Sequence, residues 1–281
     1  MNKKIKILIL GSNGMLGSAC GLYFAGCDQF EVHSLARESH NDLNNNNIII
    51  KDIVHDIIPI IGNGEYDYLI NCIGKTNKVL TTEEQYCEVT KINSYLPHFI
   101  NKLILGSNTK LIHVSTDCVF SGRLGNYDET SEPDPTDFYG MSKLVGEVGS
   151  SNSITVRTSI IGPEFKKTYR GLFEWFMKEK NPITGFDKAF FSGLTTWELA
   201  QNLNTLIQSD WEILPRLIHI PGPRINKYEL LCLINEVYGC NKEIFRDSAL
   251  QIDRSLCSDY YCNETKSWTK MLTEQFLNVR F

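Results

Sequence analysis

The feature that most constrains the fold lies at the start of the chain, where an apolar run leads directly into three evenly spaced glycines. Residues 5–10 read Ile-Lys-Ile-Leu-Ile-Leu and are followed by Gly11-Ser12-Asn13-Gly14-Met15-Leu16-Gly17, after which apolar residues recur at helical spacing. A Gly-x-x-Gly-x-x-Gly turn between a strand and a helix is typical of sheets that bind dinucleotides, because glycines allow the tight turn and the close approach of a pyrophosphate. The alternative interpretation is a purely structural turn.

The start of the predicted helix adds to the case for a bound phosphate. Its first backbone N–H groups have no partner within the helix and carry a partial positive charge, which favours an anion. We therefore expect a cofactor to contact the whole turn, namely Gly11, Asn13, Gly14, Met15, Leu16 and Gly17.

The next strand, 30–36, ends in Arg37, where an NAD-binding protein would carry a carboxylate. A guanidinium at this place can bind a 2'-phosphate, so the sequence favours NADP(H), with NAD(H) as the alternative. Arg37 could also be only a surface charge. A third strand at 48–50 is followed by Asp52, which could meet the adenine amine or lie in an exposed loop.

A fourth buried strand is predicted over 68–74, and its small terminal residue would let a dinucleotide pass close to the backbone. We expect Gly74 and Lys75 to line the cofactor there. A long helix follows over 83–105, with Pro97 as a candidate for a kink. Asn93 lies on this helix, and its amide could bind the next strand or only solvent.

Candidate catalytic residues follow the fifth strand, 111–114. Thr116 would lie at its carboxyl end, where open α/β sheets bind their ligands. Tyr139 and Lys143 stand four residues apart at the start of a predicted helix, so their side chains should leave the same face. An ammonium beside a phenol lowers the phenol pKa from its usual value near ~10. The trio would supply a hydrogen-bond donor, an acid/base and its electrostatic partner, although Tyr-x-x-x-Lys alone is often a solvated pair.

Strands alternate with helices up to a sixth strand at 153–157, which predicts an α/β fold with a doubly wound parallel sheet. We expect a dinucleotide-binding domain over 1–162. Residues 163–281 would form mainly a smaller substrate-binding lobe, with some segments returning to the sheet.

Charge and cysteine content limit the partners and the compartment. A net charge of -5 argues against nucleic acid and anionic membranes as partners. The nine cysteines form no Cys-x-x-Cys pair, which indicates reduced thiols and gives no metal-ligand spacing. The apolar run at 7–10 is too short for a signal-peptide core, and no segment approaches the ~20 apolar residues that cross a bilayer. We therefore expect a cytoplasmic protein without a membrane partner or a metal site.

Four motifs together resemble one protein family. The chain is similar to the extended short-chain dehydrogenase/reductases, and most of all to their dTDP-4-dehydrorhamnose reductase (RmlD-like) branch, over nearly its whole length. The run Ser-Thr-Asp-x-Val-Phe favours this branch over the epimerases and dehydratases of the superfamily. The motifs, in order, are Gly11-x-x-Gly14-x-x-Gly17, Ser115-Thr116-Asp117-x-Val119-Phe120, Tyr139-Gly140-x-Ser142-Lys143-x-x-Gly146-Glu147 and Arg157-Thr158-Ser159.

The resemblance implies an activity and roles for the residues that match. The reaction would be the NAD(P)H-dependent reduction of the C4 ketone of a nucleotide-linked 4-keto-6-deoxyhexose, for deoxysugar and surface polysaccharide biosynthesis. Tyr139 would protonate the ketone oxygen, Thr116 would hold it, and Lys143 would keep the phenol acidic and bind the nicotinamide ribose. By the same resemblance Gly11, Gly14, Gly17, Cys72, Gly74 and Lys143 would line the cofactor, and Tyr139 would contact it.

We expect the substrate to contact Thr116, Asp117, Cys118 and Arg254. Cys118 replaces an aromatic residue common in the family. The related GDP-fucose synthases use a cysteine here for epimerisation, but the matching histidine is not evident, so we interpret Cys118 as a packing residue. Arg254 lies in a run similar to the family's tail motif and could meet a substrate phosphate or a neighbouring carboxylate.

Several alternatives stay open. An N-acetylated sugar on UDP, a UDP-2-acetamido-2,6-dideoxy-hexos-4-ulose, competes with a rhamnose precursor on dTDP. Some family members bind Mg²⁺ at a dimer interface, so a homodimer and Mg²⁺ both remain open. Rival functions are a nucleotide-sugar 4-epimerase and a non-catalytic NADP-binding regulatory subunit, like that of methionine adenosyltransferase. The presence of all three catalytic side chains favours an enzyme.

Overall fold

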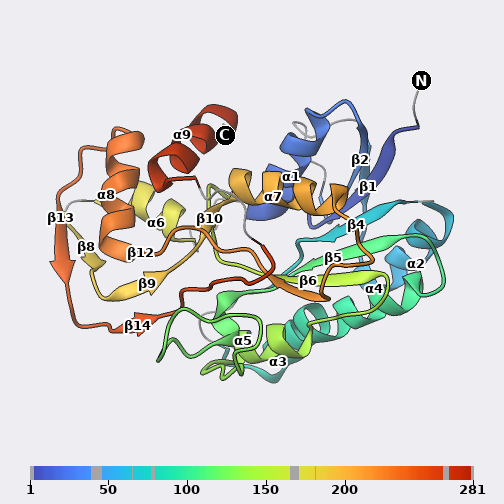
Figure 1. Ribbon diagram of the computed structural model, residues 1–281, viewed down its shortest axis with the longest axis horizontal. Helices are drawn as coiled ribbons and strands as arrows, with labels where there is room; N and C mark the ends of the chain where they lie inside the picture. The colour runs from blue at the N-terminus through green and yellow to red at the C-terminus, as the bar shows by residue number, and fades with distance from the viewer. Residues whose placement is uncertain are drawn as a thin grey trace.

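A seven-stranded parallel sheet forms the centre of the computed structural model, which describes residues 3–38, 46–64, 66–76, 80–164, 171–180, 182–261 and 266–279 (Figure 1). The strand order is β11-β6-β5-β4-β1-β2-β3, and every neighbouring pair is parallel. The predicted doubly wound α/β fold is therefore confirmed. The strands are β1 (Ile5–Leu10), β2 (Phe30–Ala36), β3 (Asn47–Ile49), β4 (Tyr68–Asn71), β5 (Lys110–Val114), β6 (Ser153–Arg157) and β11 (Leu217–His219).

Helices cover both faces of this sheet, which explains why its central strands are almost continuously apolar. Helices α1 (Met15–Ala25) and α7 (Thr196–Gln208) lie on one face, and α2 (Ile53–Gly64) and α4 (Leu96–Ile104) lie on the other (Figure 1). Successive residues of β1 point to opposite faces. Accordingly, Ile7 packs in the cluster with α1 and α7, whereas Leu8 packs in the cluster with α2 and α4.

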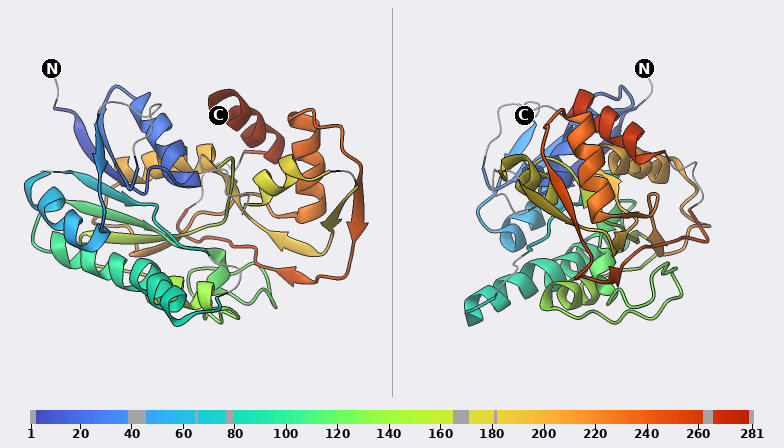
Figure 2. Two further views of the ribbon diagram at one scale, coloured as in Figure 1. Left: turned by 180° about the vertical axis from the view of Figure 1, so that it is seen from behind. Right: turned by 90° about the vertical axis from the view of Figure 1, so that its left-hand side faces the viewer.

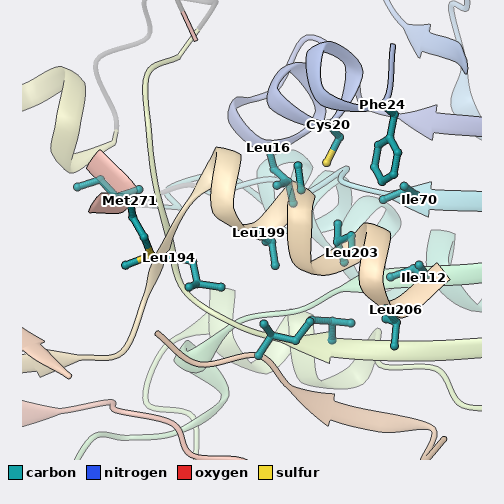
Figure 3. Packing of buried hydrophobic residues seen from close by; sticks show 14 of the residues in the cluster. Leu16, Cys20, Phe24, Ile70, Ile112, Leu194, Leu199, Leu203, Leu206 and Met271 are labelled. Carbon is teal, nitrogen blue, oxygen red and sulfur yellow. The ribbon is translucent and has the colours of Figure 1, made fainter. Parts of the chain in front are cut away.

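The core between the sheet and the first pair of helices is densely filled (Figure 3). Leu16 from α1 and Leu203 from α7 pack over Ile70 of β4 and Ile112 of β5, and all four side chains are buried. This packing holds the start of α1 against the sheet and so positions the glycine-rich turn.

The long helix predicted over 83–105 is divided into three parts. It consists of α3 (Glu83–Thr90), a π-helical turn (Lys91–Tyr95) and α4. Pro97 does not kink it, because Pro97 lies in the first turn of α4, where a missing N–H is tolerated. The irregularity is the π-helical turn, which contains Asn93.

The structure differs from the prediction at one further strand and at one helix. The fourth strand was expected to reach residue 74 but β4 ends at Asn71, so Cys72, Gly74 and Lys75 lie in the loop that follows. Helix α2, between β3 and β4, was not predicted. Pro59 lies inside this helix, where a proline removes one intrahelical hydrogen bond.

The second half of the chain builds a smaller lobe and also contributes β11 and α7 to the central sheet (Figures 1 and 2). Short strands of the lobe pair as β12-β9-β14 and β13-β8. In the parts of the chain that the structure describes, no helix combines the length and apolarity needed to span a membrane. The lobe elements are α6 (Leu172–Lys178), α8 (Lys227–Val237), α9 (Trp268–Asn278), β8 (Ile183–Phe186), β9 (Ala189–Phe191), β12 (Ile225–Asn226), β13 (Ile244–Asp247) and β14 (Ile252–Asp253).

Candidate active site

The glycine-rich turn joins β1 to α1 as predicted, and its backbone fits a diphosphate. Gly11 has a φ of 83°, which disfavours other residues, and a Cβ on Gly17 would overlap the Gly11 carbonyl oxygen. Gly14 precedes α1 without any side-chain hydrogen bond to the helix. The first turn of α1 therefore leaves its N–H groups without a side-chain cap, as the binding of an anion requires.

Among the other residues predicted on the turn, Asn13 and Met15 are half-buried and Leu16 is buried. Asn13 Nδ2 donates to the Glu38 carbonyl at 2.9 Å, which connects the turn to the segment after β2. Arg37 is exposed directly after β2, so its guanidinium is accessible on the side of the sheet where the turn lies.

Asp52 has a structural role in addition to the one predicted for it. Its carboxylate accepts hydrogen bonds from Lys91 Nζ at 2.8 Å and from the Val54 N–H at 2.9 Å. These bonds lower the pKa of Asp52 to about 2. Asp52 thus caps α2 and joins it to the π-helical turn, and its contact with an adenine remains a prediction.

Asn93 holds the loop after β4 against the helix that carries Tyr139. Its Oδ1 accepts from the Lys75 N–H at 2.8 Å, and its Nδ2 donates to the Lys75 carbonyl at 3.0 Å and to Ser142 Oγ at 2.9 Å. Asn93 is fully buried, which excludes solvent, and the hydrogen bonds of its amide go to Lys75 and Ser142 and not to the fifth strand, the other option that the sequence left open. The Lys75 ammonium itself pairs with Glu88 on α3.

Thr116 lies directly beyond β5 and is 7% exposed. Its Oγ1 accepts from the Cys118 N–H at 3.1 Å and donates to Asp117 Oδ1 at 3.2 Å, so it caps the short helical turn Asp117–Val119. These bonds hold the hydroxyl at the carboxyl edge of the sheet.

Tyr139 is brought to Thr116 by the packing of α5 (Phe138–Val145). A Cβ on Gly140 would overlap the Cys118 carbonyl oxygen, so glycine is what allows this close approach. Burial raises the pKa of Tyr139 well above its usual value, the nearby Cys118 and Asp117 act in the same direction, and a hydrogen bond with Thr116 opposes them.

Lys143 lies one turn after Tyr139 but points its ammonium into the protein. Its Nζ donates to the Val114 carbonyl at 2.8 Å and lies 3.4 Å from His113 Nε2. Burial lowers the pKa of Lys143 to about 8, against the opposing effects of Glu147 and Cys72. The expectation that Lys143 lowers the pKa of Tyr139 is wrong here, because burial dominates the titration of Tyr139 and the ammonium is directed to β5.

Cys118 is a packed thiol in this site. Burial, together with the Asp117 carboxylate, raises its pKa to about 12, although Arg254 opposes them. Arg254 Nη1 donates to Cys118 Sγ at 3.4 Å. A thiol with so high a pKa stays protonated at neutral pH and offers no thiolate to act as a base, which agrees with the interpretation of Cys118 as a packing residue.

Two cations of the lobe face the Asp117–Cys118 segment. Arg254, which the sequence singled out, has a buried Nε without any hydrogen-bond partner in the described structure. The other cation is Lys227 at the start of α8, whose Nζ lies 3.5 Å from the centroid of the Phe191 ring. Burial lowers the pKa of Lys227, against the opposing charge of Asp117. Sequence reasoning missed Lys227, because nothing local separates it from a surface lysine.

Metal binding finds no support among the residues that the structure describes, where no group of three or more His, Cys, Asp or Glu side chains could hold an ion. Mg²⁺ was left open by the sequence and remains so.

Comparisons with known proteins identify a family for this chain. A family model described as the RmlD substrate binding domain matches residues 5–246. The dTDP-4-dehydrorhamnose reductase of Aggregatibacter actinomycetemcomitans is 30% identical over 159 residues, which cover 55% of this chain and 51% of that protein. Subunit beta of the rat (Rattus norvegicus) methionine adenosyltransferase 2 is 25% identical over 256 residues, or 83% of this chain and 72% of that protein. The chain thus spans about half the length of the first of these curated relatives.

Solved structures share the fold. The dTDP-4-dehydrorhamnose reductase of Bacillus anthracis, determined in complex with NADP, superimposes with a TM-score of 0.77. The match covers 99% of this chain and 100% of that one at 20% sequence identity. At this identity the likeness supports a common architecture.

Proposed function

The chain belongs to the RmlD substrate binding domain family, and from this premise we propose that it is an NAD(P)H-dependent sugar-nucleotide reductase. Its reaction is the reduction of the C4 ketone of a nucleotide-linked 4-keto-6-deoxyhexose, and NADP(H) is the preferred cofactor. We place this reaction in the cytoplasm, where it prepares a deoxysugar donor for surface polysaccharide.

The observation that carries the proposal is the meeting of Thr116 and Tyr139 at the carboxyl edge of the sheet, beside Lys143. Thr116 follows β5 and the glycine-rich turn follows β1, and both strands run in the same direction in one sheet. The two sites therefore open on the same edge, where a dinucleotide and a second ligand can meet.

The protonation of Tyr139 suits a reduction. Because burial raises the pKa of its phenol, Tyr139 keeps its proton at neutral pH and can donate it to a ketone oxygen as negative charge develops there. The Thr116 hydroxyl lies beside the phenol, and its single proton, which it donates to Asp117 in this structure, would turn to the ketone oxygen when the substrate binds. Bound NADP(H) would supply the hydride for this chemistry.

The two cations of the lobe support an anionic substrate. The charges of Arg254 and Lys227 both act on Asp117, the residue after Thr116, and Arg254 Nε has no hydrogen-bond partner among the described residues. The Asp117 carboxylate interacts with both cations, and a single carboxylate offsets only one of the two positive charges. We assign Arg254 and Lys227 to the diphosphate of the sugar nucleotide. The base and the sugar are the features that separate a dTDP-linked from a UDP-linked N-acetylated substrate.

The test is to mix the protein with NADPH and a panel of freshly prepared dTDP- and UDP-linked 4-ketosugars and to follow the nicotinamide absorbance. Loss of absorbance, with one reduced sugar nucleotide formed for each NADPH consumed, is the expected result. A 4-epimerase would instead retain nicotinamide through purification and convert its substrate without added reductant, so the cofactor content of the isolated protein separates the two enzymes.

The second candidate is a regulatory subunit, favoured by the similarity to subunit beta of methionine adenosyltransferase 2 over 256 residues. Such a protein would bind NADPH without turning over any ketosugar, so binding without turnover across the whole panel would overturn the reductase proposal.

A further inference from the structure

A chain of hydrogen bonds runs from the loop after β4 to the catalytic lysine. The Ile73 N–H donates to Asn71 Oδ1 at 3.1 Å, Asn71 Nδ2 lies 3.1 Å from His113 Nδ1, and His113 Nε2 lies 3.4 Å from Lys143 Nζ. Asn71 and His113 are direct neighbours in the register of β4 and β5, and both are fully buried. No solvent molecule is needed to connect these groups.

The bond from the Ile73 N–H to Asn71 Oδ1 determines the direction of the other hydrogen bonds in this series. A backbone N–H can only donate, so Asn71 must turn its oxygen to Ile73 and its NH₂ group to His113. His113 Nδ1 then has to accept, which requires its lone pair. Burial, followed by the charge of Lys143, lowers the pKa of His113 well below its usual value, so the ring is neutral and carries a single proton. That proton must lie on Nε2, the nitrogen that faces Lys143.

This tautomer affects the charge of Lys143. An ammonium has only N–H donors, so the His113 Nε2–H and a charged Lys143 present donors to each other. A neutral amine has a lone pair that can accept from Nε2–H while it still donates to the Val114 carbonyl, the bond of 2.8 Å described above. Two neighbours of Lys143, Glu147 and Cys72, favour its charged form. The charge of His98 further lowers the pKa of His113 and so helps to keep that ring neutral.

We propose that His113 is a positioning residue whose Nε2–H tautomer, imposed by Asn71 and the Ile73 N–H, makes the proton of Lys143 easier to lose. Its catalytic meaning rests on the proposed function, since it assigns to Lys143 a charge that can change within the working pH range. Neither the spacing of Tyr139 and Lys143 nor the motifs around them indicate this contribution from β4 and β5.

The direct test is the tautomer of His113 in the full chain, labelled with ¹⁵N-histidine and saturated with NADP⁺. Long-range ¹H–¹⁵N correlation spectra distinguish the Nε2–H tautomer, the Nδ1–H tautomer and the imidazolium. The chain has six histidines, so His113 is identified by the loss of its signals in His113→Gln or, should that variant not fold, by their change in Asn71→Asp. We expect the Nε2–H form between about pH 6 and pH 9. An Nδ1–H form or an imidazolium in that range overturns the proposal.

The functional test is the variant Asn71→Asp, which reverses the direction of the hydrogen bonds between residue 71, His113 and Lys143. One carboxylate oxygen can still accept from Ile73 N–H, and the other then accepts from His113 Nδ1–H, which leaves the Nε2 lone pair to receive a proton from charged Lys143. We expect the alkaline limb of the kcat/KM profile to move up by about one pH unit.

The matched control is Asn204→Asp on α7, where the Tyr23 hydroxyl can rotate to donate to the new carboxylate. The alkaline limb of its kcat/KM profile should fall at the same pH as in the unaltered protein. If the alkaline limb of the kcat/KM profile falls at the same pH in Asn71→Asp as in Asn204→Asp, the role proposed for His113 is overturned. If the unaltered chain reduces no ketosugar, the proposed function fails, but the tautomer measurement still decides this proposal because it needs no turnover.

Discussion

Arg157 binds Glu147 through two nearly parallel hydrogen bonds, 2.8 Å from Nε to Oε1 and 2.7 Å from Nη2 to Oε2. Both side chains are largely buried, with exposures of 4% and 13%. Ser115 Oγ donates to the same Glu147 oxygen at 2.8 Å. The ion pair therefore joins β6 to the end of α5 and to the residue before Thr116, and it supports the segments that carry the candidate catalytic residues.

Loss of this pair should destabilise the fold strongly. Arg157→Met leaves the Glu147 carboxylate buried with only the Ser115 hydroxyl, and we expect a loss of roughly 3 kcal/mol in the free energy of unfolding in urea. The control is Arg224→Met, because Arg224 pairs with Asp253 at 2.8 Å but is 48% exposed. That change should cost less than about 1 kcal/mol. Similar losses in the two variants would contradict the structural role of the buried pair.

Replacement of Tyr139 by phenylalanine should separate chemistry from cofactor binding. Tyr139→Phe removes the only proton donor assigned to the ketone oxygen, so we expect kcat to fall by about 10³-fold. The affinity for NADPH, measured by fluorescence titration, should remain within about twofold of its original value. Tyr260→Phe, at a side chain that is 57% exposed, serves as the control and should leave both quantities unchanged. A Tyr139→Phe enzyme with most of its rate would show that the acid lies elsewhere.

The reaction should slow as the pH rises through the titration of Lys143. Its pKa of about 8 is lower than usual because the ammonium is buried, so the charged form predominates below that value and the neutral amine above it. Tyr139 does not titrate in the same range, because burial raises its pKa. If the charged form is the active one, kcat/KM should decrease above about pH 8. A profile that stays flat to about pH 9.5 would contradict a requirement for charged Lys143.

Local patterns were sufficient to predict the first part of the molecule. The strand at 5–10, the glycine-rich turn and the helix after it depend on one continuous stretch, and the structure has them as β1 and α1. The sixth strand over 153–157 was likewise predicted from its own residues, and the structure has it as β6. In these segments the apolar pattern and the turn residues that bound it predict the same element.

The environment of Lys143 could not be predicted in the same way. The four-residue spacing from Tyr139 is a property of one helix, but the contacts with Val114 and His113 depend on how α5 packs against β5. Asn71 meets His113 only because of the register between β4 and β5. Lys227 comes from an element more than 80 residues beyond Lys143, so its approach to Asp117 depends on the docking of the lobe. Long-range packing, which no local pattern encodes, determines the electrostatics of the site.

Arg37 should determine the choice between the two nicotinamide cofactors. Its exposed guanidinium directly follows β2, where it can bind a 2'-phosphate that only NADP(H) carries. We expect Arg37→Ala to weaken the binding of NADPH by about tenfold and that of NADH by less than about twofold. Arg123→Ala, another exposed arginine, is the control. Equal effects of Arg37→Ala on the two cofactors would remove the argument for a phosphorylated cofactor.

The assignment of Lys227 and Arg254 to a diphosphate is tested by comparing ligands that differ in charge. Lys227→Met and Arg254→Met keep the apolar stem of each side chain but remove its charge, so each should weaken the binding of UDP or dTDP by at least about tenfold. The affinity for the uncharged nucleosides and for NADP⁺ should not change, because neither ligand places a phosphate at this position. Lys188→Met, at an exposed lysine just before β9, removes the same charge from the lobe and should have no effect on any of these ligands. If the two active-site variants bind the nucleoside diphosphates as tightly as Lys188→Met does, the buried Arg254 Nε has another partner and the cations do not recognise the diphosphate.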